Sequence, residues 1–267
     1  MNEPLAAPAE ADLERRFGAL RRLYGDAGYA RLRSARVAVV GVGGVGSWAV
    51  EALARSGVGS LVLVDLDHVA ESNVNRQVQA LEHTLGQAKT AALADRIAAI
   101  HPQCRVHAVD EFASPDNWPG LLPIEVDAVI DACDQVRAKT AIAAWALARG
   151  TALVVAGAAG GKLEPQRVEV ADLADVSHDP LLARLRQRLR QAGAMPRQGP
   201  AGVRCVFSRE PVRRPAAEAC DTTGAPLQPG MPLACHGYGS SVTVTATFGM
   251  VAAAQALAAM SVPGKTL

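Results

Sequence analysis

Four closely spaced glycines follow a short apolar run in the segment RVAVVGVGGVGSW, residues 36–48. Glycine permits a tight turn and a close approach of the backbone to a ligand, and the N–H groups at the start of a following helix bind phosphate. The pattern predicts a nucleotide-phosphate loop formed by Gly41, Gly43, Gly44 and Gly46. Asp65, which ends the next apolar run LVLVD, has the spacing of a carboxylate that binds a ribose hydroxyl. These residues alone leave a dehydrogenase and other nucleotide-binding proteins open.

Polar side chains that follow Asp65 favour ATP chemistry. The segments DLDHVAESNVNRQ and GQAKT supply Asp67, Asn73, Asn75, Arg76, Gln77 and Lys89. A dehydrogenase has little use for an arginine and a lysine at a pyrophosphate. An enzyme that attacks the α-phosphate of ATP needs them, because negative charge builds up there in the transition state. Further along, VIDACDQ places Asp131 and Asp134 at the end of another apolar run, where a carboxylate can hold Mg²⁺ against the triphosphate.

Alternating strands and helices must position these side chains. Strand-like runs recur at VAVVG, LVLVD, CRVHAV, DAVIDA and ALVVAG, and helical patterns occupy residues 45–56, 84–100 and 136–149. This alternation predicts an α/β fold with a Rossmann-like, mainly parallel sheet wrapped by helices. In such folds ligands bind where the strands end at their carboxyl termini, and the glycine loop, Asp65 and Asp134 all follow predicted strands.

The pattern changes after residue 160. QRVEVADLA predicts an extra C-terminal strand, DPLLARLRQRLRQAG an amphipathic helix that ends at Gly193, and residues 210–232 a long proline-rich loop before a terminal helix. We predict a disordered tail at residues 1–12. Residues 13–267 form a single ATP-binding adenylation domain, of which residues 160–267 are the half that faces the substrate.

The composition excludes several classes of protein. The formal net charge of the 267 residues is only +1, so a nucleic-acid partner must be met by a local basic patch. The five cysteines form no C-x-x-C pair, which argues against structural zinc and a disulfide framework and favours a cytoplasmic protein. The uncharged residues 237–260 have the length of a membrane span, but their Ala, Ser, Thr and Gly content favours a buried helix at an interface over membrane association.

The motifs together resemble the ubiquitin-activating-enzyme superfamily of carboxylate adenylators. G-x-G-G-x-G, D-x-D, N-x-N-R-Q, the lysine and D-x-x-D occur in this order within residues 16–160. The resemblance implies ATP, Mg²⁺ and a structural monovalent cation as cofactors, and a homodimer. It also implies that ATP is bound by the four glycines together with Asp65, Asp67, Asn73, Arg76, Gln77 and Lys89. The catalytic residues would be Arg76, Lys89, Asp134 at the metal, and Arg22 or Arg16 as an arginine finger from the second subunit.

Further segments are similar to one subfamily, the tRNA threonylcarbamoyladenosine dehydratases. They include RFGALRRLYG, AGAAGGKLEPQRVEVADLA, VRCVFSREP and CHGYGSSVTVTATFG, whereas the two C-x-x-C pairs of sulfur-carrier adenylators are missing. The resemblance implies a ligase-type, ATP-dependent cyclisation of threonylcarbamoyladenosine in tRNA: the threonyl carboxylate is adenylated and the neighbouring carbamoyl group closes the ring. It also implies a sulfur-relay or redox protein partner. The alternative is adenylation of a protein C-terminal carboxylate for sulfur-carrier or ubiquitin-like activation.

The tRNA itself is expected to meet a basic helix. In DPLLARLRQRLRQ the leucines form one helical stripe, and two basic stripes lie beside it, formed by Arg184 with Arg188 and by Arg186 with Arg190. With the arginines that follow, these residues predict phosphate binding, the alternative being a solvated surface helix.

One cysteine near the end of the chain is a candidate thiol. Cys235 closes the predicted long loop, where a loop cysteine of related enzymes forms a thioester. Because the ring closure needs no protein nucleophile, we predict that Cys235 packs against or shapes the site and is not a covalent catalyst.

Overall fold

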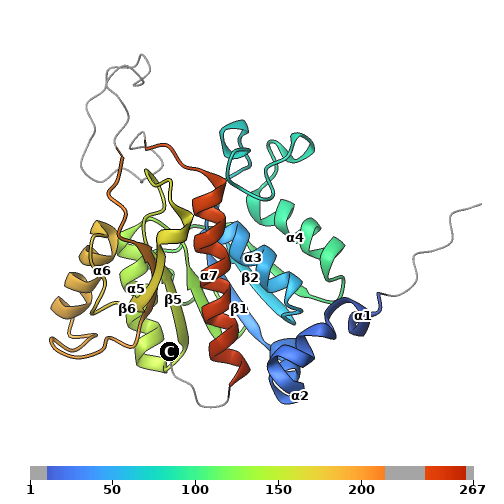
Figure 1. Cartoon of the computed structure of the whole chain (residues 1–267), viewed down its shortest axis with the longest axis horizontal. Coiled ribbons are helices and arrows are strands. Elements are labelled where there is room, and N and C mark those ends of the chain that lie inside the picture. The colour runs from blue at the N-terminus through green and yellow to red at the C-terminus, as the bar shows by residue number, and fades with distance from the viewer. Residues whose placement is uncertain (1–10, 214–237, 263–267) are drawn as a thin grey trace, which may run out of the picture.

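The computed structural model describes residues 11–213 and 238–262, and in them a seven-stranded sheet forms the centre of the molecule (Figure 1). Its strands are β1 (Arg36–Val40), β2 (Ser60–Val64), β3 (Arg105–Val109), β4 (Ala128–Asp131), β5 (Ala152–Ala156), β6 (Val168–Asp172) and β7 (Arg204–Ser208). They lie in the order β3-β2-β1-β4-β5-β7-β6, and all neighbours are parallel except β6, which is antiparallel to β7. The predicted α/β fold, with a mainly parallel sheet and extra C-terminal strands, is confirmed.

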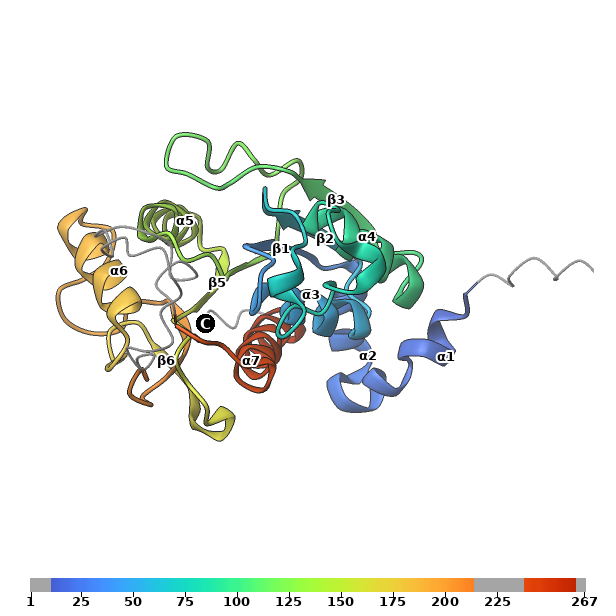
Figure 2. The same ribbon diagram turned by 90° about the horizontal axis from the view of Figure 1, so that it is seen from above.

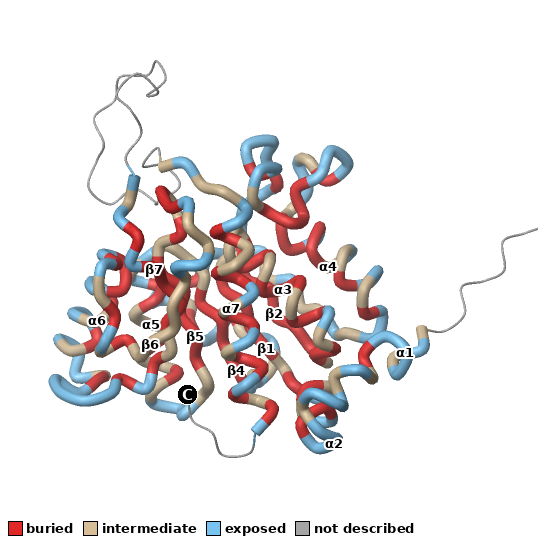
Figure 3. The backbone as a smooth tube through the Cα atoms, viewed as in Figure 1, coloured by how far each residue is buried: buried red, intermediate tan, exposed pale blue. Residues whose placement is uncertain are grey.

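Helices cover both faces of this sheet (Figure 2). They are α1 (Leu13–Phe17), α2 (Ala19–Ser34), α3 (Gly46–Arg55), α4 (Lys89–Ile100), α5 (Val136–Arg149), α6 (Pro180–Gln191) and α7 (Val242–Ser261), with short 3₁₀ turns at Glu71–Asn73, Glu82–Thr84 and Pro165–Arg167. One hydrophobic cluster joins the sheet to α2, α3, α4 and α7, and a second joins its other face to α5 and α6. The buried residues therefore lie along the strands and the inner sides of the helices (Figure 3).

The helix predicted over residues 84–100 is shorter than expected. It begins at Lys89, because Gly86 has a left-handed φ of +83° that interrupts any helix there. The preceding chain instead bonds to residue 69, which accepts from the N–H of Gly86 and donates to the carbonyl of Gln87. The effect is to put Lys89 in the first turn of α4, next to the chain that follows β2.

The uncharged C-terminal segment forms α7, which crosses the sheet and packs against α3 (Figure 1). Gly249 makes this close contact possible, because a Cβ there would meet the Val45 carbonyl and lie 2.8 Å from Trp48 Cβ. α7 is long and apolar enough to cross a membrane, but its inner side, including Val244 and Phe248, is buried in the core. The packing agrees with the predicted buried helix.

Several predictions fall outside the described residues. Of the predicted tail, residues 1–10 lie outside them, while Asp12 caps α1 by accepting from the Arg15 N–H at 3.0 Å. Most of the predicted loop 210–232 and the candidate thiol Cys235 also lie outside. The three cysteines within the described residues, Cys104, Cys133 and Cys205, are free.

Candidate functional site

A cavity of about 290 Å³ opens at the carboxyl edge of the sheet, next to the ends of β1, β2 and β4. The order of the strands reverses here, because β1 connects outward to β2 while β4 lies on the other side of β1. Open α/β sheets bind ligands at such a switch point, and the volume is at the small end of the range of ligand pockets.

The glycine loop forms one wall of this cavity. Gly41 has a φ of +80°, and a Cβ there would lie 2.8 Å from the Cys133 nitrogen, so the loop can lie against the chain after β4 only with glycine at this position. Gly43 and Gly44 line the cavity with Gly41. α3 begins immediately afterwards without a side-chain cap, which leaves N–H groups of its first turn for a phosphate.

Gly46 is placed differently from the other three glycines. It does not line the cavity; a Cβ there would instead meet the Gly41 carbonyl oxygen. Its position serves the close packing of α3 on the loop, which is the usual reason for the last glycine of this fingerprint.

Asp65 is a buried carboxylate at the end of β2 that also lines the cavity. One oxygen accepts from the Val42 N–H at 2.8 Å and the other from the Asp67 N–H at 2.9 Å. Burial raises the pKa of this carboxyl, while the two backbone bonds and Lys89 oppose the rise. The carboxylate is thus fixed to the glycine loop, and each oxygen keeps lone-pair capacity for a ligand hydroxyl.

Two cations face the cavity. The Lys89 Nζ, buried in the first turn of α4, lies 2.7 Å from Asp67 Oδ2, whose side chain is half exposed. The Arg76 guanidinium donates at 2.8 Å both to the Ser72 carbonyl and to Asn75 Oδ1. These contacts hold both cations at the cavity.

The turn that carries Arg76 is held by amide side chains. Asn73 is buried, and its Oδ1 accepts from the Ala70 N–H at 3.0 Å. Gln77 is also buried, and its Oε1 accepts from Gln79 Nε2 at 3.2 Å. Asn73 and Gln77 both line the cavity, so the N-x-N-R-Q motif contributes three side chains to it.

The loop after β4 closes the opposite wall with Cys133 and Asp134. It is anchored from beneath by a fully buried ion pair, in which Lys139 Nζ lies 3.0 Å from Asp131 Oδ1. The same carboxylate oxygen accepts from the Cys133 N–H at 3.1 Å and from its thiol at 3.0 Å. Burial and the neighbouring carboxylate raise the pKa of the Cys133 thiol, so it is not a thiolate. Of the two predicted carboxylates, Asp131 belongs to the core and Asp134 to the cavity.

Sequence reasoning missed several contributors to this site. Cys133, Gln135 and Phe112 line the cavity, and Phe112 is an exposed aromatic residue on the chain after β3. Phe112 lies three residues after the strand-like run CRVHAV, so its place shortly after a predicted strand was the available signal. No signal in the sequence indicated the role of Lys139, because its partner Asp131 lies on β4 and Lys139 lies on α5.

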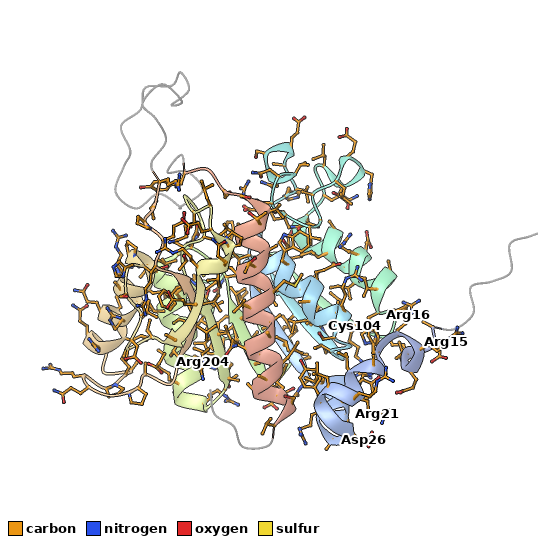
Figure 4. All side chains as sticks on the ribbon, viewed as in Figure 1. Arg15, Arg16, Arg21, Asp26, Cys104 and Arg204 are labelled. Carbon is orange, nitrogen blue, oxygen red and sulfur yellow. The ribbon has the colours of Figure 1, made fainter. Side chains whose placement is uncertain are left out.

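The predicted arginine fingers lie away from the cavity of their own chain. Arg22 is exposed on α2. Arg16, labelled in Figure 4, donates to the Ile100 carbonyl at 2.6 Å at the end of α4. The predicted tRNA-binding residues Arg184, Arg186, Arg188 and Arg190 lie on α6, outside the cavity.

The donors at the cavity suit a magnesium ion that a nucleotide brings with it. No group of three or more His, Cys, Asp and Glu side chains forms a metal site within residues 11–213 and 238–262. Mg²⁺ in nucleotide sites takes one or two carboxylates and completes its shell with phosphate oxygens and water. Asp134 and Asp67 are carboxylates at the cavity that fit this requirement.

A family profile, a curated relative and two crystal structures all show that this chain is similar to the same kind of protein. The sequence profile of the ThiF family matches residues 16–266. The chain is 42% identical over 249 residues to the tRNA threonylcarbamoyladenosine dehydratase of Escherichia coli (strain K12), covering 92% of this chain and 93% of that protein. It is similar to crystal structures of the E. coli tRNA N6-threonylcarbamoyladenosine dehydratase. The complex with ATP has a TM-score of 0.82 at 41% identity, covering 94% of this chain and 96% of that chain. The complex with AMP has a TM-score of 0.81 at 40% identity, covering 97% and 98%.

Proposed function

The chain belongs to the ThiF family, and from this premise we propose that it uses ATP to dehydrate threonylcarbamoyladenosine in tRNA by adenylating its carboxylate. One observation carries the proposal. All the residues expected to bind ATP, except Gly46, come together from separate segments around one cavity at the switch point of the sheet. The E. coli tRNA threonylcarbamoyladenosine dehydratase is similar to this chain over almost its whole length.

The reaction has two balanced steps. A carboxylate oxygen of the threonyl group attacks the α-phosphate of ATP, the bond to the pyrophosphate breaks, and an acyl-adenylate forms. The carbamoyl group of the same nucleoside then attacks the acyl carbon and loses a proton, and AMP leaves with the carboxylate oxygen. Because the second nucleophile is already tethered, its high effective molarity replaces a protein nucleophile. The substrate loses the elements of water, and ATP becomes AMP and pyrophosphate.

The residues at the cavity divide these tasks. The glycine loop and the first turn of α3 bind phosphates, and Asp65 accepts a ribose hydroxyl. Lys89 and Arg76 stabilise the charge that develops on the α-phosphate. This electrostatic stabilisation is stronger in a site shielded from water. Phe112 and Ala113 supply the apolar surface for the base. Asp134 would hold Mg²⁺, which would supply positive charge against the departing pyrophosphate.

Pyrophosphate release tests the activity and separates it from its alternative. The enzyme is incubated with ATP and with modified tRNA, unmodified tRNA or no tRNA, and release is expected only with modified tRNA. Equal release with all three, or release driven only by a protein C-terminus, would contradict the proposal. Lys89→Ala and Arg76→Ala are expected to slow release by about a hundredfold or more with unchanged melting temperature, whereas the exposed Arg149→Ala keeps the wild-type rate.

The metal role of Asp134 has its own test. Asp134→Asn should raise the Mg²⁺ concentration needed for half-maximal rate, while saturating Mg²⁺ restores much of the activity, because one carboxylate ligand is lost. A Mg²⁺ titration that is superimposable on that of the wild type would remove Asp134 from the metal.

We further propose a homodimer through the outer side of α7. This helix carries no charged residue, and Val242 and Met250 on it are exposed large hydrophobic side chains. Met250→Glu is expected to give monomers in light scattering after size exclusion, and a dimer with this variant would place the interface elsewhere. Arg22 can act on ATP only from a second subunit, because it does not line the cavity of its own chain.

The remaining expectations concern the location of the enzyme and its partners. The free cysteines of the described residues fit a reducing compartment, which supports a cytoplasmic enzyme. A structural monovalent cation and a sulfur-relay or redox partner stay predictions. The substrate tRNA is proposed to bind along α6, whose arginines lie outside the cavity.

A further inference from the structure

The arginines of the C-terminal half fall into two groups. Arg167, Arg209 and Arg213 form ion pairs with Glu164, Glu169 and Glu210. In contrast, no ion pair within the described residues involves the arginines of α6 and of the chain that leads to β7, namely Arg184, Arg186, Arg188, Arg190, Arg197 and Arg204. A local excess of unpaired positive charge on a chain of net charge +1 creates a field that attracts an anionic partner.

Part of this charge lines a groove beside α6. The groove has a volume of about 480 Å³, separate from the ATP cavity, and its lining is Ala183, Arg186, Gln187, Arg190, Gln191 and Arg197. The lining residues of α6 form one face of the helix, next to the buried leucines. Every polar side chain in the lining is an arginine or a glutamine, and no carboxylate is among them. Such donors suit phosphate oxygens.

The arginines of this groove differ in what they already bind. Arg186 donates to the Leu173 carbonyl at 3.0 Å and to the Val176 carbonyl at 2.7 Å, which ties α6 to the chain after β6. Arg190 Nε is buried and has no hydrogen-bond partner in the described part of the chain. A buried donor without an acceptor is costly, and a bound anion would supply the acceptor.

The groove runs along α6 from Ala183, and its arginines Arg190 and Arg197 lie at or beyond the end of the helix that is far from the ATP cavity. α6 starts at the carboxyl edge of the sheet, where its cap Asp179 accepts from the Ala158 N–H after β5 at 2.9 Å. It runs from there toward the amino edge, where Arg204 begins β7 (Figure 4). The rise from Asp179 to Arg190 is about 17 Å. An RNA that reaches the ATP cavity with one nucleotide can therefore meet this groove only with nucleotides distant from the reacting one.

We propose that this groove is a phosphate-binding subsite that holds the sugar–phosphate backbone of the tRNA substrate away from the reacting nucleotide. Arg190 and Arg197 each bind one phosphate of that backbone, and Arg186 positions the groove through its bonds to Leu173 and Val176. The inference rests on the proposed function for the identity of the RNA. It implies that the enzyme recognises the tRNA body as well as the modified nucleoside.

The first experiment measures binding to tRNA without ATP as a function of salt. Each phosphate contact that is lost reduces the slope of log K against log salt by about 0.7–0.9. Arg190→Gln/Arg197→Gln is expected to reduce the slope by about 1.5 and to weaken binding at least tenfold at low salt. Arg55→Gln/Arg149→Gln removes the same charge from other faces and should leave the slope unchanged. An unchanged slope in the groove variant would overturn the proposal.

The second experiment varies the length of the substrate. With full-length modified tRNA, the groove variant should have a raised KM and an unchanged kcat. With a short anticodon-loop oligonucleotide that carries the same modification, the variant and the wild type should have equal KM values. Equal losses on both substrates would show that the groove acts through the fold or the ATP site, which contradicts the proposal.

A third measurement, thermal protection by inorganic phosphate, shows whether the groove binds small anions and not tRNA. If the variant loses thermal protection by inorganic phosphate but binds tRNA like the wild type, the groove is not a tRNA subsite. A wild-type enzyme that releases no pyrophosphate with modified tRNA would defeat the proposed function. The salt slope would still report independently whether the groove binds RNA.

Discussion

Replacing Lys139 with methionine tests how the wall of the cavity proposed to bind ATP is held. The Lys139 and Asp131 side chains are fully buried, and Nζ donates to Asp131 Oδ1 at 3.0 Å, to the Asp131 carbonyl at 3.3 Å and to the Ala156 carbonyl at 3.0 Å. Burial opposes the charge, but the Asp131 carboxylate outweighs it and raises the pKa of Lys139, so the ammonium is the form at neutral pH. Methionine keeps the approximate length of the side chain and removes the charge and all three bonds.

The expected loss is large because Asp131 then becomes a buried charge without a countercharge. Breaking a buried pair from one side costs about 3–5 kcal/mol of unfolding free energy. Urea unfolding followed by tryptophan fluorescence measures this quantity. Arg149→Met breaks an exposed pair of 3.9 Å with Glu125 and should cost less than about 1 kcal/mol.

A double variant separates the effect of charge from that of packing. Asp131→Asn/Lys139→Met removes both charges, and its stability should recover by more than half of the loss in Lys139→Met, since replacement of a whole buried pair is often neutral. A single variant within about 1 kcal/mol of the wild type would refute the assignment of a buried ion pair. A double variant as unstable as the single one would show that the lost hydrogen bonds and shape, not the charge, dominate.

Three further perturbations test the packing that supports the site. Gly249→Ala should destabilise the fold by about 1–3 kcal/mol, because its Cβ meets α3, whereas Gly239→Ala, with no atom within 4 Å, should be close to neutral; thermal unfolding of the two variants compares them. His101 is buried, and burial together with Arg33 lowers its pKa below 6.5. The unfolded state therefore takes up the proton first, and stability falls as the pH drops below about 6.5. His101→Phe should flatten the fall in melting temperature between about pH 7.5 and 5.5. If the variant shows the same fall as the wild type, groups other than His101 cause the pH dependence. Arg16→Ala removes the bond to the Ile100 carbonyl at the end of α4 and should cost about 0.5–1 kcal/mol in urea unfolding, with no loss expected if solvent replaces that bond fully.

The sequence alone predicted the fold class, six of the seven strands and most of the residues that line the cavity, but it did not predict β7 as a strand. Strand-like runs that alternate with helical patterns admit few arrangements, because parallel strands need crossover helices. Polar residues that closely follow such runs must gather at one edge of the sheet, as Asp65 and Asp134 do, and the chain after β2 brings Arg76 and Lys89 to the same cavity. Local signals were weaker for the start of α4, where the left-handed Gly86 overrode an apolar helical pattern.

The tertiary structure decided which side chains of a given type serve the core and which serve a ligand. Asp131 and Asp134 stand in one motif, but only the fold places Lys139 beneath Asp131 and turns Asp134 to the cavity. The four arginines of α6 are equivalent by spacing, yet Arg186 is bound to two carbonyls and Arg190 lines a groove with Arg197. The reason is physical: periodicity fixes the face of a helix on which a residue lies, whereas its partners belong to segments that only the packed chain brings near.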